Sequence, residues 1–126
     1  MDKKVLYSAV VLDDESSSKL INKFYDIIPI DWKTYSHHMT INLGELPIQL
    51  KYNIDDIVEL RVNSFGFNDK VMAVGVEGYY SKNKIPHITV AVNINDGGKP
   101  VMSNNIINWK PIIEFNITGI VKEITN

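Results

Sequence analysis

The chain has 126 residues, of which 44% are hydrophobic and 22% are charged, and a formal net charge of -2. This length and balance suit one folded domain, which we place at residues 1–126, and exclude a disordered or fibrous chain. The small negative charge gives no general attraction to long nucleic acids, and the absence of cysteine excludes disulfides, zinc-thiolate sites and thiol nucleophiles.

The first part of the chain predicts a strand followed by a helix. Residues 4–12 are rich in valine and leucine, which favours a buried strand. Asp13 or Asp14 can cap a helix that runs to about residue 28, and Pro29 ends the pattern. The apolar face of this helix would carry Leu20, Ile21, Phe24, Tyr25, Ile27 and Ile28. No stretch has the length of a membrane span and no cleavage site follows the first strand, so we expect a cytoplasmic protein with no membrane partner.

The rest of the chain predicts strands joined by polar turns. The expected strands cover residues 37–43, 57–65, 71–77, 85–94 and 112–121. In the second of these, Val58, Leu60 and Val62 alternate with polar residues and would face the core. Residues 96–109 would form a glycine-rich loop and a short helical turn, with Ser103 near its start as a cap.

One internal repeat stands out. Residues 38–43, "HMTINL", and 87–92, "HITVAV", share the order His, apolar, Thr, apolar. Side chains two residues apart on a strand share a face, so His38 would point with Thr40, and His87 with Thr89. His37 would point to the opposite face and make a local hydrogen bond. The chance that two of only three histidines have threonine two places on is about one in two hundred. The repeat suggests two lobes related by a pseudo-two-fold axis.

The chemistry of the repeat favours a phosphodiester substrate. If the two strands line one groove, two imidazoles and two hydroxyls would converge there. Cleavage needs a base for the attacking oxygen and an acid for the leaving oxygen, and the histidine pKa near 6.5 makes both forms accessible at neutral pH. The threonine hydroxyls would donate to the phosphoryl oxygens. This scheme needs no metal and no other cofactor.

The segments "HHMTINL" and "PHITVAVN" resemble the two His-x-Thr signatures of the 2H phosphoesterase superfamily. The resemblance covers essentially the whole domain. It implies an α+β, bilobal, LigT-like fold with antiparallel sheets around a central groove, and metal-independent phosphodiesterase activity on nucleotides or RNA ends. Carried over to this chain, it implies that His38 and His87 are the catalytic histidines and that Thr40 and Thr89 bind the phosphate.

The substrate hypotheses differ in class. The leading one is a cyclic di- or oligonucleotide second messenger, such as cGAMP-type immune signals, degraded by a viral immune-evasion enzyme in the host cytoplasm. It draws on the segment from Pro86 to Asn104, which resembles the second-motif region of phage proteins that degrade such messengers, and on the Ile-, Asn- and Lys-rich composition. The alternatives are cleavage of 2',3'-cyclic phosphates at RNA ends, cleavage of 2'-5' oligoadenylate, and binding of a nucleotide without cleavage.

Other residues are candidates for substrate binding. The hydroxyl of Tyr7 could bond a phosphate oxygen, or belong to a core tyrosine. Lys99 and the two glycines before it could approach an anion, or form an ordinary surface turn. Asn42 and Asn93 continue the motif strands on the groove face. At least one aromatic side chain is expected to stack on a base, the candidates being Trp32, Tyr35 and Trp109.

Overall fold

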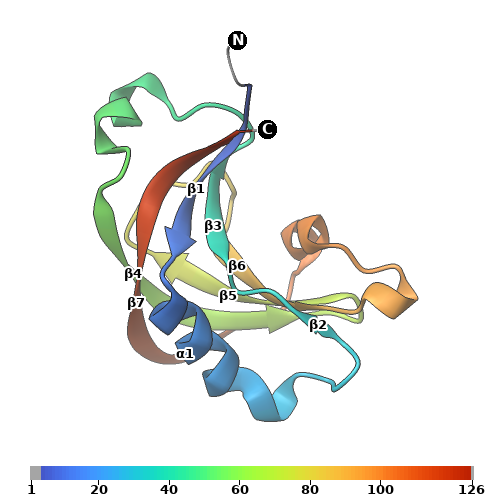
Figure 1. The fold of residues 1–126 in the computed structure, drawn as a ribbon. Coiled ribbons are helices and arrows are strands. Elements are labelled where there is room, and N and C mark those ends of the chain that lie inside the picture. Colours follow the sequence, from blue (N-terminus) through green and yellow to red (C-terminus); the bar gives the residue numbers. More distant parts are fainter. Residues whose placement is uncertain (1–3, 126) are drawn as a thin grey trace.

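The computed structural model describes residues 4–125, and its strands form one sheet in which all pairings are antiparallel (Figure 1). The strands are β1 (Val5–Leu12), β2 (Lys33–Thr34), β3 (His38–Asn42), β4 (Ile57–Phe67), β5 (Val71–Glu77), β6 (His87–Val92) and β7 (Trp109–Thr125). The helices are α1 (Asp14–Phe24) and the short 3-10 helices η1 (Tyr25–Ile27), η2 (Ile48–Asn53), η3 (Ile94–Asp96) and η4 (Pro100–Asn105).

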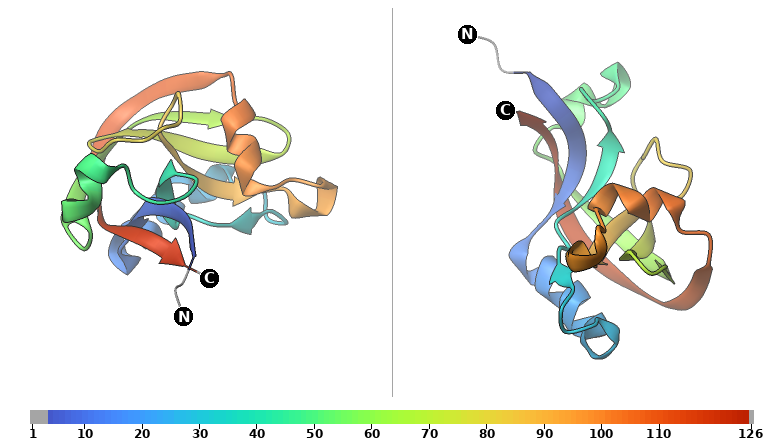
Figure 2. Two further views of the ribbon diagram at one scale, coloured as in Figure 1. Left: turned by 90° about the horizontal axis from the view of Figure 1, so that it is seen from above. Right: turned by 90° about the vertical axis from the view of Figure 1, so that its right-hand side faces the viewer.

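The sheet closes on itself. The strand order is β2-β6-β3-β1-β7-β4-β5, and β5 also pairs with β6. Six strands therefore form a ring, and β2 extends it as a short partner of β6. The two further views show how the long strands curve to make this closure, with η4 packed beside β5 and β6 (Figure 2). Closure leaves few unpaired strand edges.

The core fills the inner side of this ring. Its largest fully buried side chains include Leu20, Met39, Ile41, Leu60 and Ile88. The expected inward residues of β4 are confirmed, since Leu60 and Val62 are fully buried and Val58 packs against the core. Met39 and Ile88, the residues between His and Thr in the two motifs, are both core residues, and this fixes which face of each strand is left for the motifs.

Helix α1 begins as the sequence predicts and ends earlier. The side chain of Asp13 accepts a hydrogen bond from the Ser16 amide at 2.7 Å, and this bond lowers the pKa of Asp13. The helix ends at Phe24 and tightens into η1, where three residues make a turn instead of 3.6. The apolar face shifts accordingly, so Tyr25 and Ile27, expected to be buried, are 70% and 51% exposed.

Strand β7 is longer than expected and is interrupted by a bulge. Val62 of β4 pairs with Phe115, but Ser64 pairs with Pro111, so β7 has two extra residues between these points. The simple alternation of Ile113, Phe115 and Ile117 therefore breaks: Ile117 is buried, whereas Ile113 is 91% exposed.

The α+β class is confirmed in a coarser form, as one antiparallel sheet with few helices. The expected division into two lobes with pseudo-two-fold symmetry is not confirmed, because both motif strands belong to the same closed sheet. Within residues 4–125, no helix is long and apolar enough to cross a membrane.

Candidate active site

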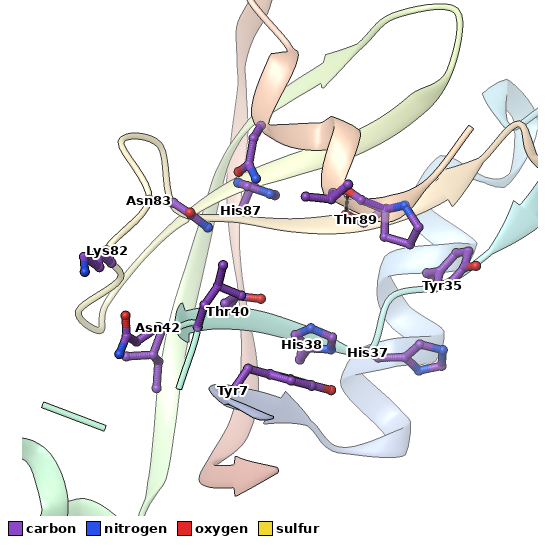
Figure 3. A pocket seen from close by; sticks show the side chains of 15 residues that line it. Tyr7, Tyr35, His37, His38, Thr40, Asn42, Lys82, Asn83, His87 and Thr89 are labelled. Carbon is purple, nitrogen blue, oxygen red and sulfur yellow. Dashed lines mark hydrogen bonds between the residues drawn. The ribbon is translucent and has the colours of Figure 1, made fainter. Parts of the chain in front are cut away.

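The two motifs meet through the residue in the middle of each. Met39 of β3 pairs with Ile88 of β6 in antiparallel register, and both side chains point into the core. The flanking histidines and threonines therefore point to the other face of the sheet. The antiparallel direction places His38 toward the Thr89 end and His87 toward the Thr40 end, so the imidazoles occupy opposite corners of the group (Figure 3).

The chain bulges immediately before β3, which corrects the expectation for His37. The Ser36 amide bonds to the carbonyl of Thr89 at 2.8 Å, while Met39 pairs with Ile88. Three residue steps on this segment thus match one step on β6, and His37 and His38 are the extra residues. The bulge is confined to the pairing with β6, because His37 and His38 stay in register with Leu12 and Val11 of β1. His37, expected on the opposite face, nevertheless lines the same cleft as His38.

A backbone carbonyl two residues earlier in the chain orients the imidazole of His87. The residue is 9% exposed, and its Nδ1 lies 2.8 Å from the carbonyl oxygen of Ile85. A carbonyl only accepts, so Nδ1 carries a proton and Nε2 is the ring nitrogen left for the cleft. Burial lowers the pKa of His87, and the bond to Ile85 partly opposes this shift.

His38 lies against an aromatic ring. The ring of Tyr7, from β1, has its centroid 5.2 Å from that of His38, at a tilt of 32°. Burial lowers the pKa of His38, and the nearby imidazoles of His37 and His87 lower it further because a second positive charge there is unfavourable. Burial therefore favours the neutral form of both motif histidines, and an anionic ligand would raise both pKa values.

The two threonines have different surroundings. The hydroxyl of Thr89 lies 2.8 Å from that of Ser103 and donates a longer bond, of 3.4 Å, to the carbonyl of Pro100. Ser103 is 1% exposed and lies inside η4, not at its start as expected, because η4 begins at Pro100 after Lys99. The backbone carbonyl of Thr40 accepts a hydrogen bond from the Ser81 hydroxyl at 2.8 Å. Within residues 4–125 the Thr40 hydroxyl has no hydrogen-bond partner.

The four motif side chains line one cleft of about 660 Å³. Tyr7, Tyr35 and Asn42, all expected near the substrate, line it too. The described part of the chain contributes three histidines and one lysine to this lining and no aspartate or glutamate. In a protein of net charge -2, this local charge distribution favours an anionic ligand.

The ends of the cleft differ in chemistry. Asn42, Lys82 and Asn83 lie at one end, and Tyr35 and His37 lie at the other (Figure 3). The sequence pattern did not identify Lys82 or Asn83 as cleft residues. Their position depends on the loop before β6, which is tied to β3 by the bond from the Lys82 amide to the carbonyl of Ile41 at 2.8 Å. No local sequence motif predicts this contact between the loop and β3.

Four residues predicted near the substrate do not line the cleft: Trp32, Asn93, Lys99 and Trp109. The Asn93 side chain, expected on the groove face, instead donates to the carbonyl of Asp69 at 3.1 Å. Trp32 packs against the main core, and Lys99 is an exposed residue at the start of η4. Trp109 packs beside His87, with ring centroids 6.3 Å apart, and its indole N–H donates to the carbonyl of Ile106. The amides of Gly97 and Gly98 bond to carbonyls of their own turn, so they do not form an anion-binding loop.

The arrangement offers two proton-transfer groups and two hydroxyl donors around one small volume. A neutral imidazole can accept a proton, and an imidazolium can donate one. Within residues 4–125, no group of three or more histidine, aspartate or glutamate side chains is placed to hold a metal ion.

Comparison with known proteins identifies one family. The family model described as the fungal tRNA ligase phosphodiesterase domain matches residues 7–121, which include both motifs and the whole cleft. No curated protein matches the chain.

Proposed function

The chain belongs to the family of fungal tRNA ligase phosphodiesterase domains, and from this premise we propose that it hydrolyses a 2',3'-cyclic phosphate at the end of a ribonucleotide chain. It is a phosphodiesterase, a hydrolase of the 2H type. The observation that carries the proposal is the pairing of Met39 with Ile88, because it turns both His-x-Thr motifs into one cleft that carries no carboxylate within the described residues.

The proposed reaction assigns one role to each motif side chain. One imidazole of the pair His38 and His87 takes a proton from water as the water oxygen attacks phosphorus. The bond from phosphorus to one ribose oxygen breaks, and the other imidazole gives that oxygen a proton. Attack and departure lie on opposite sides of phosphorus. The placement of the two histidines at opposite corners supports this division of roles.

The threonine hydroxyls would bind the phosphoryl oxygens. Charge on these oxygens grows during attack, and a donor fixed in place stabilises it without reorganisation. The cyclic phosphate would also supply the negative charge that raises the histidine pKa values and makes a protonated imidazole available near neutral pH. In this proposal the negative charge of the substrate favours the protonated imidazole that burial disfavours.

A substrate panel tests the proposal against the other hypotheses. The purified protein is incubated with a trinucleotide ending in a 2',3'-cyclic phosphate, with cyclic dinucleotides of the cGAMP type, and with 2'-5' oligoadenylate. We expect the cyclic-phosphate trinucleotide to have the highest kcat/KM. The messenger substrate and the viral role are predictions from the sequence, and a higher kcat/KM for a cyclic dinucleotide would favour them over the proposal.

The same panel separates an enzyme from a binding module. A module would retain each ligand and release it unchanged after long incubation, whereas the proposed enzyme releases an opened phosphate monoester. Product identity is read by mass, because addition of water to the cyclic phosphate increases the mass of the trinucleotide by that of one water.

A further inference from the structure

The segment that leads into the first motif carries a row of three side chains. Lys33, Tyr35 and His37 are alternate residues of this segment. The Lys33 ammonium lies 5.2 Å from the centroid of the Tyr35 ring, and that centroid lies 6.0 Å from the His37 ring, which meets it edge-on at 79°. A cation, an aromatic ring and an imidazole therefore follow one another, and the last two line the cleft.

This row is attached directly to the second motif strand. Lys33 and Thr34 pair with β6, and the amide of Tyr35 bonds to the carbonyl of Val90 at 2.8 Å. The Ser36 amide continues the pairing at Thr89. The end of the row at His37 therefore lies nearest to Thr89. From there the row runs along β6 to Lys33, which pairs with Val92.

The position of the row is fixed by a strained residue. Ser36 is fully buried and has a φ of 74°, a conformation that a residue other than glycine rarely adopts. Its hydroxyl donates to the carbonyl of Ser17 in α1 at 3.1 Å, and the Ser17 hydroxyl donates back to the Ser36 carbonyl at 2.6 Å. Such strain persists where the surroundings over-determine the backbone, and it is common at ligand sites.

We propose that Lys33, Tyr35 and His37 bind the nucleotide that precedes the scissile cyclic phosphate in a linear ribonucleotide. This inference rests on the proposed function. Tyr35 stacks with the base and His37 faces the phosphate that joins the two nucleotides. Lys33, at the outer end of the row, faces the next phosphate along the chain. Binding of single-stranded nucleic acid combines aromatic stacking with positive charge along the backbone in this way.

The surroundings of the row fit an anionic chain. Among the residues that the structure describes, no carboxylate lies within ion-pairing distance of Lys33. The opposite end of the cleft offers Asn42, Lys82 and Asn83 but no aromatic ring, and the Asn42 amide already donates to the carbonyl of Glu45 at 2.9 Å. Within residues 4–125, only the Tyr35 end combines an aromatic ring with a lysine placed over it.

The test compares two substrates that share the same 3'-terminal nucleotide. One is a nucleoside 2',3'-cyclic phosphate, and the other is a trinucleotide ending in that group. We expect the wild-type kcat/KM to be higher for the trinucleotide. Tyr35→Leu should lower the ratio of the two values about tenfold, Tyr35→Phe should restore most of it, and Lys33→Ala should lower both the ratio and its dependence on salt.

A matched control is available on α1. Lys23 also lies over an aromatic ring, 5.0 Å from the centroid of Phe115, and does not line the cleft. Lys23→Ala should leave the substrate ratio unchanged. A wild-type ratio near one, an equal loss on both substrates in Tyr35→Leu, or loss of the ratio in Lys82→Ala instead of Lys33→Ala would overturn the inference.

Binding of a trinucleotide that already ends in a 3'-phosphate tests the row without cleavage. We expect Tyr35→Leu to raise its Kd about tenfold and Lys23→Ala to leave it unchanged. If this Kd difference holds but the wild type does not cleave the substrate, the proposed function is refuted and the binding row is not. Equal Kd values for wild type and Tyr35→Leu would refute the binding row alone if the wild type cleaves.

Discussion

Replacing Ser103 by alanine would leave Thr89 without its shortest hydrogen bond. The two hydroxyls lie 2.8 Å apart, and Ser103 is almost completely buried. The bond from Thr89 to the carbonyl of Pro100 is longer, at 3.4 Å. When Thr89 donates its proton to a phosphoryl oxygen, Ser103 can still donate to Thr89, which orients the hydroxyl and makes it a stronger donor.

The size of the effect follows from this geometry. Loss of one buried hydrogen bond costs about 0.5–1.5 kcal/mol of stability. If the same energy acts on the orientation of Thr89 in the transition state, kcat/KM falls about 2- to 10-fold, since about 1.4 kcal/mol corresponds to a factor of ten. Thr89→Val removes the donor itself and should cost about 10²- to 10³-fold. Ser103→Ala added to Thr89→Val should then cause no further loss of kcat/KM.

The control for Ser103→Ala is a second buried hydroxyl pair. Ser16 lies 3.2 Å from the Thr118 hydroxyl, between α1 and β7, and neither residue lines the cleft. The Ser16 hydroxyl also accepts a hydrogen bond from the Thr118 amide at 2.8 Å, so Ser16→Ala should lower the free energy of unfolding, measured in urea, by at least as much as Ser103→Ala and leave kcat/KM unchanged. The role of Ser103 would be refuted by unchanged kcat/KM in Ser103→Ala, or by a full further loss in the double variant.

The remaining predictions concern pH and backbone packing. Because burial lowers the pKa of both His38 and His87, the alkaline limb of the kcat/KM profile of the free enzyme should lie below about pH 6.5, as an apparent value of the coupled pair. Bound phosphate raises both pKa values, so kcat should fall at higher pH than kcat/KM; coincident profiles would contradict this. The same lowered pKa values mean that the unfolded chain binds more protons just below pH 6.5, so stability is complete above that pH and decreases as pH falls further. Urea unfolding of wild type and His87→Gln at two pH values measures this, and an equal pH dependence of both would count against it. Gly119→Ala would place a methyl group 2.6 Å from the Val10 side chain and 2.8 Å from the Val11 carbonyl, and should destabilise the protein by about 1–3 kcal/mol; an unchanged Tm would refute the packing argument.

Local sequence patterns predict the individual strands and the start of the helix, but they do not predict that the sheet closes. Alternation in β4 and the cap at Asp13 depend on neighbouring residues, and both expectations are confirmed. The pairing of β5 with β6 closes the sheet through contacts between separate segments, which no periodicity reports. The early end of α1 and the bulge in β7 likewise result from tertiary packing that overrides a regular repeat.

The candidate site likewise contains residues whose positions the sequence predicts and residues whose positions depend on contacts between distant segments. The repeated spacing of His and Thr predicts that His38 lies with Thr40 and His87 with Thr89, and all four line one cleft. The position of His37 could not be predicted, because it depends on the bulge after Ser36 and on the bonds of Ser36 to α1. Ser103 reaches Thr89 only because η4 folds back onto β6, and the sequence order of these residues does not encode that contact.

The most direct test of the central claim measures hydrolysis of the cyclic-phosphate trinucleotide by the wild type, His38→Ala and His87→Ala in EDTA. The account predicts that the chelator leaves the wild-type rate unchanged. It predicts that each substitution lowers kcat at least about 10²-fold, because one proton transfer is lost, while a native melting transition is retained. A folded variant that keeps the wild-type rate, or a wild type that EDTA inactivates, would contradict it.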